Sequence, residues 1–209
     1  MRPLLRAGST VGGCPFPIRP GLSATETPVF WLPAHDTGAV VLAATPPLLS
    51  GGADLSGALG PADAETSDDG EYFRFDLGRG QYLNLVRLHD ADAAAPLSIF
   101  IPVDTDGLDR IDTASRLLHA LLGRRVLPDK RDLTRQQRRR SRHMLQAVDG
   151  RMNGASYREI AGVVYGVARV ADEPWKTSAL RDAVMDLVRD AFAMIEGGYL
   201  TLLRQRRRN

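Results

Sequence analysis

The sequence contains one cysteine, Cys14, among 209 residues. It allows no internal disulfide, and no cysteine–histidine cluster has the spacing of a zinc site. No run of about 18 apolar residues is present, which excludes a membrane-spanning helix. The first thirty residues lack the continuous apolar core of a secretory signal and are interrupted by prolines. We therefore expect a cytoplasmic protein without membrane contact.

Signatures of catalysis are also scarce. The four histidines are scattered and none forms a metal-binding pair: His35, His89, His119 and His143. No glycine-rich phosphate loop is followed by a lysine, because Gly78–Gly80 lies within a hairpin pattern and predicts a turn. We therefore expect no enzymatic activity, no metal and no cofactor.

What the chain does contain is a division of charge. Apolar residues make up 44% and charged residues 25%, the usual mixture of a globular protein. Residues 1–133 carry 12 basic and 17 acidic groups, a balance of −5. Residues 134–209 carry 15 basic and 8 acidic groups, a balance of +7. The basic part is expected to face a polyanion.

Turn-forming residues and short apolar runs alternate in the first half. Residues 1–27 are rich in Gly, Pro, Ser and Thr and predict a flexible arm. A hairpin is predicted over Pro28–Pro47, with strands at Val29–Leu32 and Val40–Leu42. The small, acidic segment Gly51–Gly70 predicts an exposed loop.

Three further strands are predicted over Glu71–Leu77, Tyr82–Leu88 and Leu97–Val103, followed by a helix over Asp112–Leu122. Together these elements indicate an α+β domain at residues 28–125, built on a small antiparallel sheet.

The last third predicts helices over Thr134–Asn153, Ser156–Tyr165 and Thr177–Glu196. Ser156 and Glu159 have capping-box spacing, and Gly154 follows the first helix as a C′ residue. The apolar stripe expected on the first helix is Met144, Leu145, Val148 and Met152. A helix-turn-helix domain is therefore predicted at residues 134–209.

In such a domain the last helix enters the major groove with its N-terminal residues first. If Leu180, Val184 and Leu187 face the core, the residues expected to point away are Lys176, Thr177, Ser178, Arg181 and Met185. Hydroxyl groups can bind phosphate at a helix N-terminus, and arginine can bind guanine bidentately.

The connection before this helix is long. Ten residues lie between Gly166 and Thr177, whereas the usual turn has three or four. An inserted loop at Val167–Pro174 or a non-standard helix crossing would explain this length. Trp175 is expected to pack as a core anchor.

Arginines form the second candidate surface. Five surround the first helix, and no acidic residue occurs between Thr134 and Val148: Arg135, Arg138, Arg139, Arg140 and Arg142. Phosphate contacts are predicted for some of them, and His143 is expected to be a histidine on the helix surface. The tail Arg204–Arg208 is either a phosphate-binding arm or a solubilising end. The candidate DNA-binding residues are Lys176, Thr177, Ser178, Arg181, Arg158, Arg138, Arg139, Arg142, Arg206, Arg207 and Arg208.

Four short runs, Gly154–Ala161, Trp175–Asp182, Val188–Asp190 and Gly197–Tyr199, resemble the RovC-like DNA-binding domain. That domain belongs to proteobacterial transcriptional activators linked to secretion systems and mobile elements. The similarity extends over about Leu133–Leu203 and includes the long connection.

The resemblance implies a sequence-specific activator that acts as a homo-oligomer. It gives the groove-facing role to Lys176, Thr177, Ser178 and Arg181. Pro28–Pro33 is similar to the opening of the sheet domain that often precedes this family's helices. Relatives often carry a helical segment upstream, which Met1–Thr27 does not predict, so a shortened member or a start inside a longer reading frame is expected.

The leading hypothesis is thus a cytoplasmic bacterial activator that binds double-stranded DNA. Its 28–125 domain would self-associate, or contact RNA polymerase or a regulatory protein. One alternative is a protein-interaction and oligomerisation module that regulates another DNA-binding factor. Another is a nucleic-acid-processing enzyme or recombination accessory factor.

Overall fold

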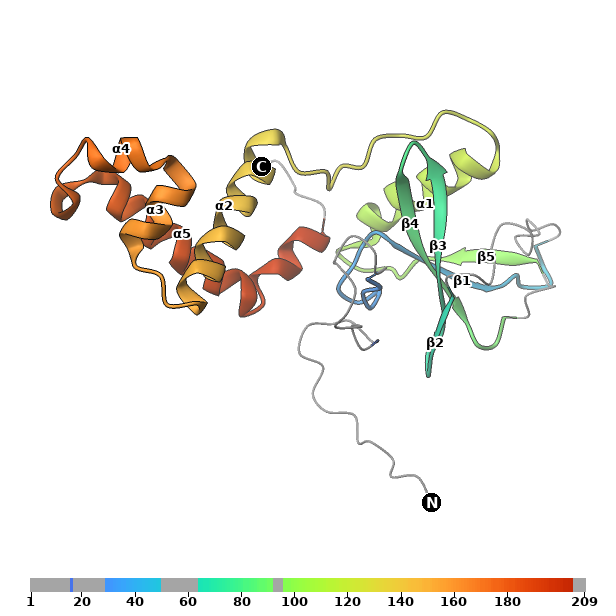
Figure 1. Cartoon of the computed structure of the whole chain (residues 1–209). Coiled ribbons are helices and arrows are strands. Elements are labelled where there is room, and N and C mark those ends of the chain that lie inside the picture. The colour runs from blue at the N-terminus through green and yellow to red at the C-terminus, as the bar shows by residue number, and fades with distance from the viewer. Residues whose placement is uncertain (1–15, 17–28, 50–63, 92–95, 205–209) are drawn as a thin grey trace, which may run out of the picture. The chain divides into compact units, whose positions relative to one another are not determined.

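The structure, a computed structural model, describes residues 16, 29–49, 64–91 and 96–204. It divides into two compact units. The first contains the chain up to Arg131 and again from Leu203 onward, and the second is Asp132–Leu202. The sheet lies in the first unit and the helical array in the second (Figure 1). The predicted fold class is confirmed.

Five strands form the sheet, in the order β2-β3-β4-β1-β5. They are β1 Ala39–Ala44, β2 Glu65–Ser67, β3 Gly70–Gly78, β4 Gln81–Leu88 and β5 Leu97–Phe100. Strands β3 and β4 form the predicted hairpin, whose turn has positive φ at Gly78, Arg79 and Gly80. The pairings are antiparallel as expected except β1–β4, which is parallel.

Two expectations for the first unit were wrong. Residues 29–32 are not a strand, because both sides of β1 are already occupied by β4 and β5. Phe30 instead packs edge-to-face against Phe16 and Tyr72. The loop expected over Gly51–Gly70 contains β2, which pairs with β3. Cys14 and the rest of the predicted arm apart from Phe16 lie outside the described residues.

Helix α1, Gly107–Leu121, begins five residues before its predicted start. Leu117 packs into the core formed by Val40, Leu42 and Leu85. The inner face of α1 also holds polar side chains, and the Thr113 hydroxyl donates a hydrogen bond to the Thr37 carbonyl at 3.0 Å. Burial of α1 therefore combines apolar packing with specific hydrogen bonds.

A buried ion-pair network fixes the segment that follows α1. Arg116 Nη1 lies 2.7 Å from Asp129 Oδ2, and Arg131 bridges Asp36 at 2.7 Å and Asp129 at 2.8 Å. Gly38 leaves room for the guanidinium, since a Cβ there would lie 1.5 Å from Arg131 Nη1. The network joins three separate parts of the chain.

The two carboxylates of this network respond differently to their surroundings. Burial raises the pKa of Asp36, and the charge of Arg131 offsets this only in part. Burial also acts to raise the pKa of Asp129, but hydrogen bonds and charge from Arg131 hold it below its usual value. The ionised form of Asp129 is thus the more strongly stabilised.

The chain returns to the first unit after the helices. The Leu203 carbonyl accepts hydrogen bonds from the Thr37 amide and hydroxyl, each at 3.3 Å. Arg204 forms an ion pair with Asp106 at 3.0 Å. These contacts belong to the first unit, and the second unit extends to Leu202.

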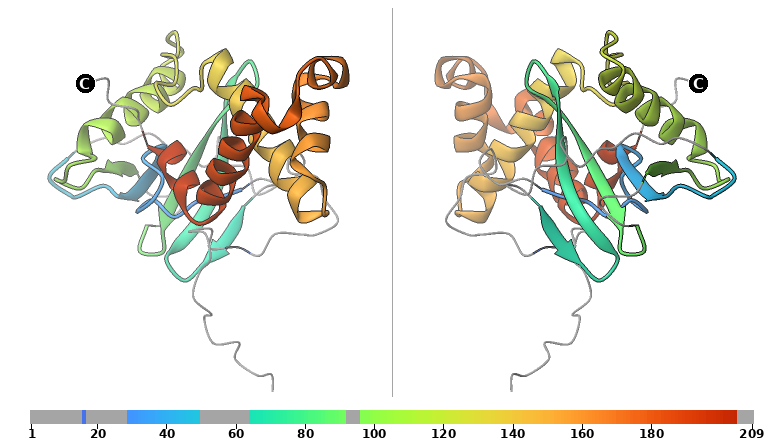
Figure 2. Two further views of the ribbon diagram at one scale, coloured as in Figure 1. Left: turned by 90° about the vertical axis from the view of Figure 1, so that its left-hand side faces the viewer. Right: turned by 90° about the vertical axis from the view of Figure 1, so that its right-hand side faces the viewer.

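The second unit packs α2 and α3 against α5 (Figure 2). Its core is formed by small and branched side chains from every α-helix: Ala147, Ile160, Ala161, Val170, Leu180, Val184, Leu187 and Val188. The elements are α2 Arg135–Met152, α3 Tyr157–Tyr165, α4 Val167–Ala171, η2 Trp175–Thr177, α5 Ala179–Ile195 and η3 Gly198–Leu203.

Local capping sets the helix boundaries in this unit. The Ser156–Glu159 capping box is present as predicted, and Thr134 forms a second one with Gln137. Gly154 and Gly166 have φ of 83° and 98° directly after α2 and α3, a conformation that costs glycine little. Both predicted helix ends are confirmed.

Three predictions in this unit need correction. Leu145 and Met152 are exposed, and Ala147 joins Val148 in the core instead. The segment Val167–Pro174, for which an inserted loop was one of two alternatives, contains α4, and Val170 on this helix is buried. Helix α5 begins two residues later than predicted, because Thr177 belongs to η2.

Candidate nucleic-acid interface

The entry to α5 presents two of the predicted DNA-binding residues to solvent. Lys176 and Thr177 lie in η2 and are exposed. The Thr177 hydroxyl donates a 3.4 Å hydrogen bond to the Pro174 carbonyl, which leaves its oxygen able to accept a bond from a ligand. Trp175 packs against the helical core, as expected for an anchor.

Ser178 does not point away from the protein as we expected. It is 5% exposed. Its oxygen accepts a hydrogen bond from the Leu180 amide at 3.1 Å, and its hydroxyl donates to Glu173 Oε2 at 2.7 Å. Ser178 is therefore the N-cap of α5, and its hydroxyl is already used within the protein.

Arg181 lies in the first turn of α5. Its side chain is 42% exposed and approaches Asp182 at 3.5 Å, a separation too long to hold the guanidinium firmly. Further along the exposed face of α5, Arg189 pairs with Asp186 at 2.8 Å and with Asp190 at 3.2 Å. The aspartates make this part of the face unfavourable for a phosphate backbone.

Four arginines form one continuous surface on α2. At 100° per residue they fall within about 100° of the helix circumference, and all four are exposed: Arg135, Arg138, Arg139 and Arg142. We call this surface the α2 basic face. It lies opposite Ala147 and Val148, which are buried in the core.

Arg140, the fifth arginine of α2, lies on another side of the helix and pairs with Asp190 of α5. It joins two helices, a role that our interpretation of the arginine cluster missed. The α-helical period could have predicted this, because at 100° per residue Arg140 lies outside the arc that the other four arginines occupy.

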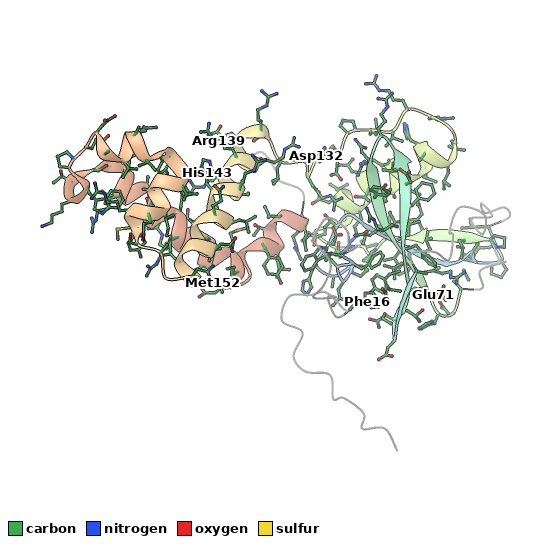
Figure 3. The ribbon with its side chains drawn as sticks, viewed as in Figure 1. Phe16, Glu71, Asp132, Arg139, His143 and Met152 are labelled. Carbon is green, nitrogen blue, oxygen red and sulfur yellow. The ribbon has the colours of Figure 1, made fainter. Side chains whose placement is uncertain are left out.

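His143 follows the α2 basic face by one residue and is visible beside Arg139 in Figure 3. Its ring packs edge-to-face against Tyr165 of α3, with ring centroids 6.3 Å apart. The pKa of His143 is lowered mainly by its partial burial and to a smaller extent by the positive charges of Arg139 and Arg142. The expected surface histidine is thus partly covered by α3.

Arg158 is exposed in the first turn of α3. The neighbouring Glu159 is held by hydrogen bonds to the Ser156 hydroxyl and amide, which lower the pKa of Glu159. Arg206, Arg207 and Arg208 lie outside the described residues. The candidate interface therefore has three separate parts: the α2 basic face, Arg158, and the first turn of α5 with Lys176 and Thr177.

Two other kinds of feature are absent from the described residues. No group of three or more His, Cys, Asp or Glu side chains within residues 16, 29–49, 64–91 and 96–204 is placed to hold a metal ion. In the same ranges, no helix has the length and apolar character needed to cross a membrane.

Comparison with known proteins identifies one family. The model of a DNA-binding domain from a transcription factor of the type VI secretion system (T6SS) matches residues 100–204. This match begins before Leu133 and so includes α1. No curated protein matches the chain.

Proposed function

The chain belongs to the RovC DNA-binding domain family of T6SS transcription factors, and we propose that it is a sequence-specific transcription activator. On this proposal residues 134–209 bind duplex DNA in the bacterial cytoplasm. The first turn of α5 enters the major groove, and the α2 basic face contacts phosphates. The 28–125 domain mediates self-association or contacts a regulatory protein or RNA polymerase.

The α2 basic face is the observation that carries this proposal. Four exposed arginines on one side of a helix form a concentrated positive surface, and residues 134–148 contain no acidic group to neutralise it. Such a surface binds a polyanion by releasing condensed counterions. A face that only solvates a helix usually mixes acidic and basic residues.

The first turn of α5 supplies the second part of the proposal. Arg181 of this turn and Lys176 and Thr177 of the preceding η2 are accessible, and Ser178 caps the start of the helix. A guanidinium at this position can donate two hydrogen bonds to the N7 and O6 atoms of guanine. Specificity would then come from few residues, with affinity supplied mainly by α2.

The proposal is tested by selecting bound sequences from a random duplex pool with the full chain, then measuring binding at several salt concentrations. We expect one enriched motif, and an affinity that falls steeply as salt rises. Absence of salt-sensitive binding to any enriched or genomic sequence would contradict the function.

Replacing Arg138, Arg139 and Arg142 with alanine should weaken binding to all sequences alike. The slope of log affinity against log salt should flatten by about 0.9 for each phosphate that the variant no longer neutralises. The control is Arg189→Ala, which removes one positive charge, against three in the triple variant, from a guanidinium that two carboxylates already hold. Equal losses of binding free energy per charge removed would show that overall charge, and not the α2 basic face, controls binding.

A second candidate function is a protein-interaction module that regulates another DNA-binding factor. It is favoured by an apolar hollow of about 330 Å³ between α2, α5 and η3, whose lining includes Met144, Leu145, Ile195 and Tyr199. This function predicts that Leu145→Glu abolishes regulation, whereas alanine at Arg138, Arg139 and Arg142 leaves it unchanged. The activator hypothesis predicts the reverse: alanine at Arg138, Arg139 and Arg142 abolishes regulation, whereas Leu145→Glu leaves it unchanged.

A further inference from the structure

Helix α1 exposes large apolar side chains, although its buried side mixes polar residues with Ala114 and Leu117. Four polar residues of this helix are buried in the interior of the first unit: Asp109, Arg110, Thr113 and Arg116. Four large apolar residues are instead exposed, Leu108 by 72%, Ile111 by 47%, Leu118 by 47% and Leu122 by 63%. An amphipathic helix normally faces solvent with its polar side, so the outer side of α1 has the composition of a contact surface.

The spacing of these residues specifies what kind of contact they fit. Leu108, Ile111, Ser115, Leu118 and Leu122 follow one another at alternating intervals of three and four residues. This is the a/d pattern of a two-helix seam over two heptads. We call these five residues the α1 seam. Thr113, Arg116 and Leu117, on the opposite side, are buried against the first unit.

We propose that the α1 seam pairs with the α1 seam of a second copy of this chain, with the two helices antiparallel. This deepens the self-association proposed for the 28–125 domain and rests on that part of the proposed function. Because the same surface serves both partners, each residue of the seam meets its symmetry-related set, as in a closed twofold dimer.

The charges along α1 favour the antiparallel direction. Residues 104–112 contain four aspartates, of which Asp109 is buried and Asp106 and Asp112 pair with Arg204 and Lys130, whereas residues 119–125 contain two arginines and no acidic residue. Asp104, Arg124 and Arg125 are exposed. Two antiparallel copies would place the acidic end of each helix opposite the basic end of the other, whereas parallel copies would place like charges together. The same polarity also suits the dipole of each helix.

The size of the seam sets the strength of the dimer. Helix α1 has 15 residues and is therefore about 22 Å long. One such pair covers less than the roughly 800 Å² per partner of a standard interface. Phe100 and Val103 are also exposed just before the helix and extend the apolar surface. We expect a reversible dimer whose population depends on concentration.

Sedimentation of the full chain over a concentration series tests the pairing. The wild type should pass from monomer to dimer. Ile111→Glu with Leu118→Glu should raise the dissociation constant by roughly thirtyfold or more, as for two anchors of an interface. Leu48→Glu, at another exposed leucine of the first unit, should leave it unchanged. Thermal unfolding of each variant checks that the fold is intact.

Charge exchange tests the direction of the helices. A chain with Arg124→Asp and Arg125→Asp should self-associate poorly, and so should one with Asp104→Lys and Asp112→Lys. In a parallel pair each variant would associate as well as the wild type, so the loss in each single variant reports the antiparallel direction. An equimolar mixture of the two should recover pairing as heterodimers, because acidic ends then meet basic ends. The Asp112 substitution also removes an exposed pair with Lys130, which contributes little by itself.

Four results would overturn the proposal. The wild type could stay monomeric at every concentration, which would mean that this chain itself or another partner covers the seam. The glutamate variants of the seam could dimerise normally. Leu145→Glu alone could abolish the dimer, which would assign it to the α2–α5 hollow. The mixed charge variants could fail to pair. Salt-dependent DNA binding by the monomeric seam variant, measured separately, tests the DNA-binding function independently.

Discussion

The two units of this protein use their charged side chains for different purposes. In the first unit Arg116 and Arg131 are held by Asp129 and Asp36 within the fold. In the second unit the α2 basic face remains exposed to solvent. The same residue type thus forms ion pairs within one unit and stays accessible on the surface of the other, and only the first use needs desolvated ion pairs.

Of the substitutions considered, removal of Arg131 should have the largest effect on the stability of the fold. Arg131→Ala leaves Asp36 buried without its cation, which should lower the free energy of unfolding by about 3–5 kcal/mol. The control is Lys130→Ala, whose exposed pair with Asp112 should contribute less than about 1 kcal/mol. Urea denaturation measures both. Equal, small losses of stability would show that the Arg131 network does not stabilise the first unit.

Arg181→Ala should affect recognition without affecting the fold. The expected loss is about 1–3 kcal/mol of binding free energy at one base pair, because a single guanidinium reads a single guanine. Titration of the selected motif, of a motif changed at that pair and of random DNA measures this loss. A uniform loss on all three DNAs would remove the reading role of Arg181.

Ser178 and Thr177 provide a comparison between neighbouring hydroxyls. Ser178→Ala removes the buried N-cap of α5 and should lower the free energy of unfolding by about 0.5–2 kcal/mol. Thr177→Ala removes an exposed hydroxyl and should lower it by less than about 0.5 kcal/mol. Thermal unfolding distinguishes them. A larger stability loss for Thr177→Ala would contradict the assignment of the cap.

The smallest effect should be the pH response of His143. Because its folded-state pKa lies below the unfolded value of about 6.5, the unfolded chain takes up the proton first. The free energy of unfolding should therefore fall as the pH decreases through about 6.5. His143→Gln should remove this decrease.

DNA affinity should respond to pH in the opposite direction. Phosphates near Arg139 and Arg142 would raise the pKa of His143 in the complex, so affinity should increase as the pH falls from about 7 to about 6. An identical profile in wild type and His143→Gln would mean that the DNA lies away from this histidine.

Local patterns in the sequence predicted the helical unit well. Ser156, Glu159 and Gly154 act on neighbouring backbone groups, so their spacing alone indicates where helices begin and end. The hydrophobic period likewise predicted that Leu180, Val184 and Leu187 would be buried, and they are. The exposed positions of Lys176 and Thr177 follow from the same local pattern.

Other features depend on contacts that the local sequence pattern does not specify. Phe30 has the composition of a strand residue, yet β1 is already paired on both sides. Ser178 has the appearance of an exposed donor, yet Glu173 folds back to accept its hydroxyl. Arg140 and Asp190 are fifty residues apart in the chain and meet only because α2 packs on α5.

The sequence by itself therefore determined the helix boundaries, the charge division near residue 133 and the family, because each is encoded in residues close together along the chain. The tertiary structure decided which charges are used within the fold and which remain exposed. That distinction arises because a guanidinium is neutralised by whichever carboxylate the packing brings within about 3 Å, and this distance depends on the whole fold.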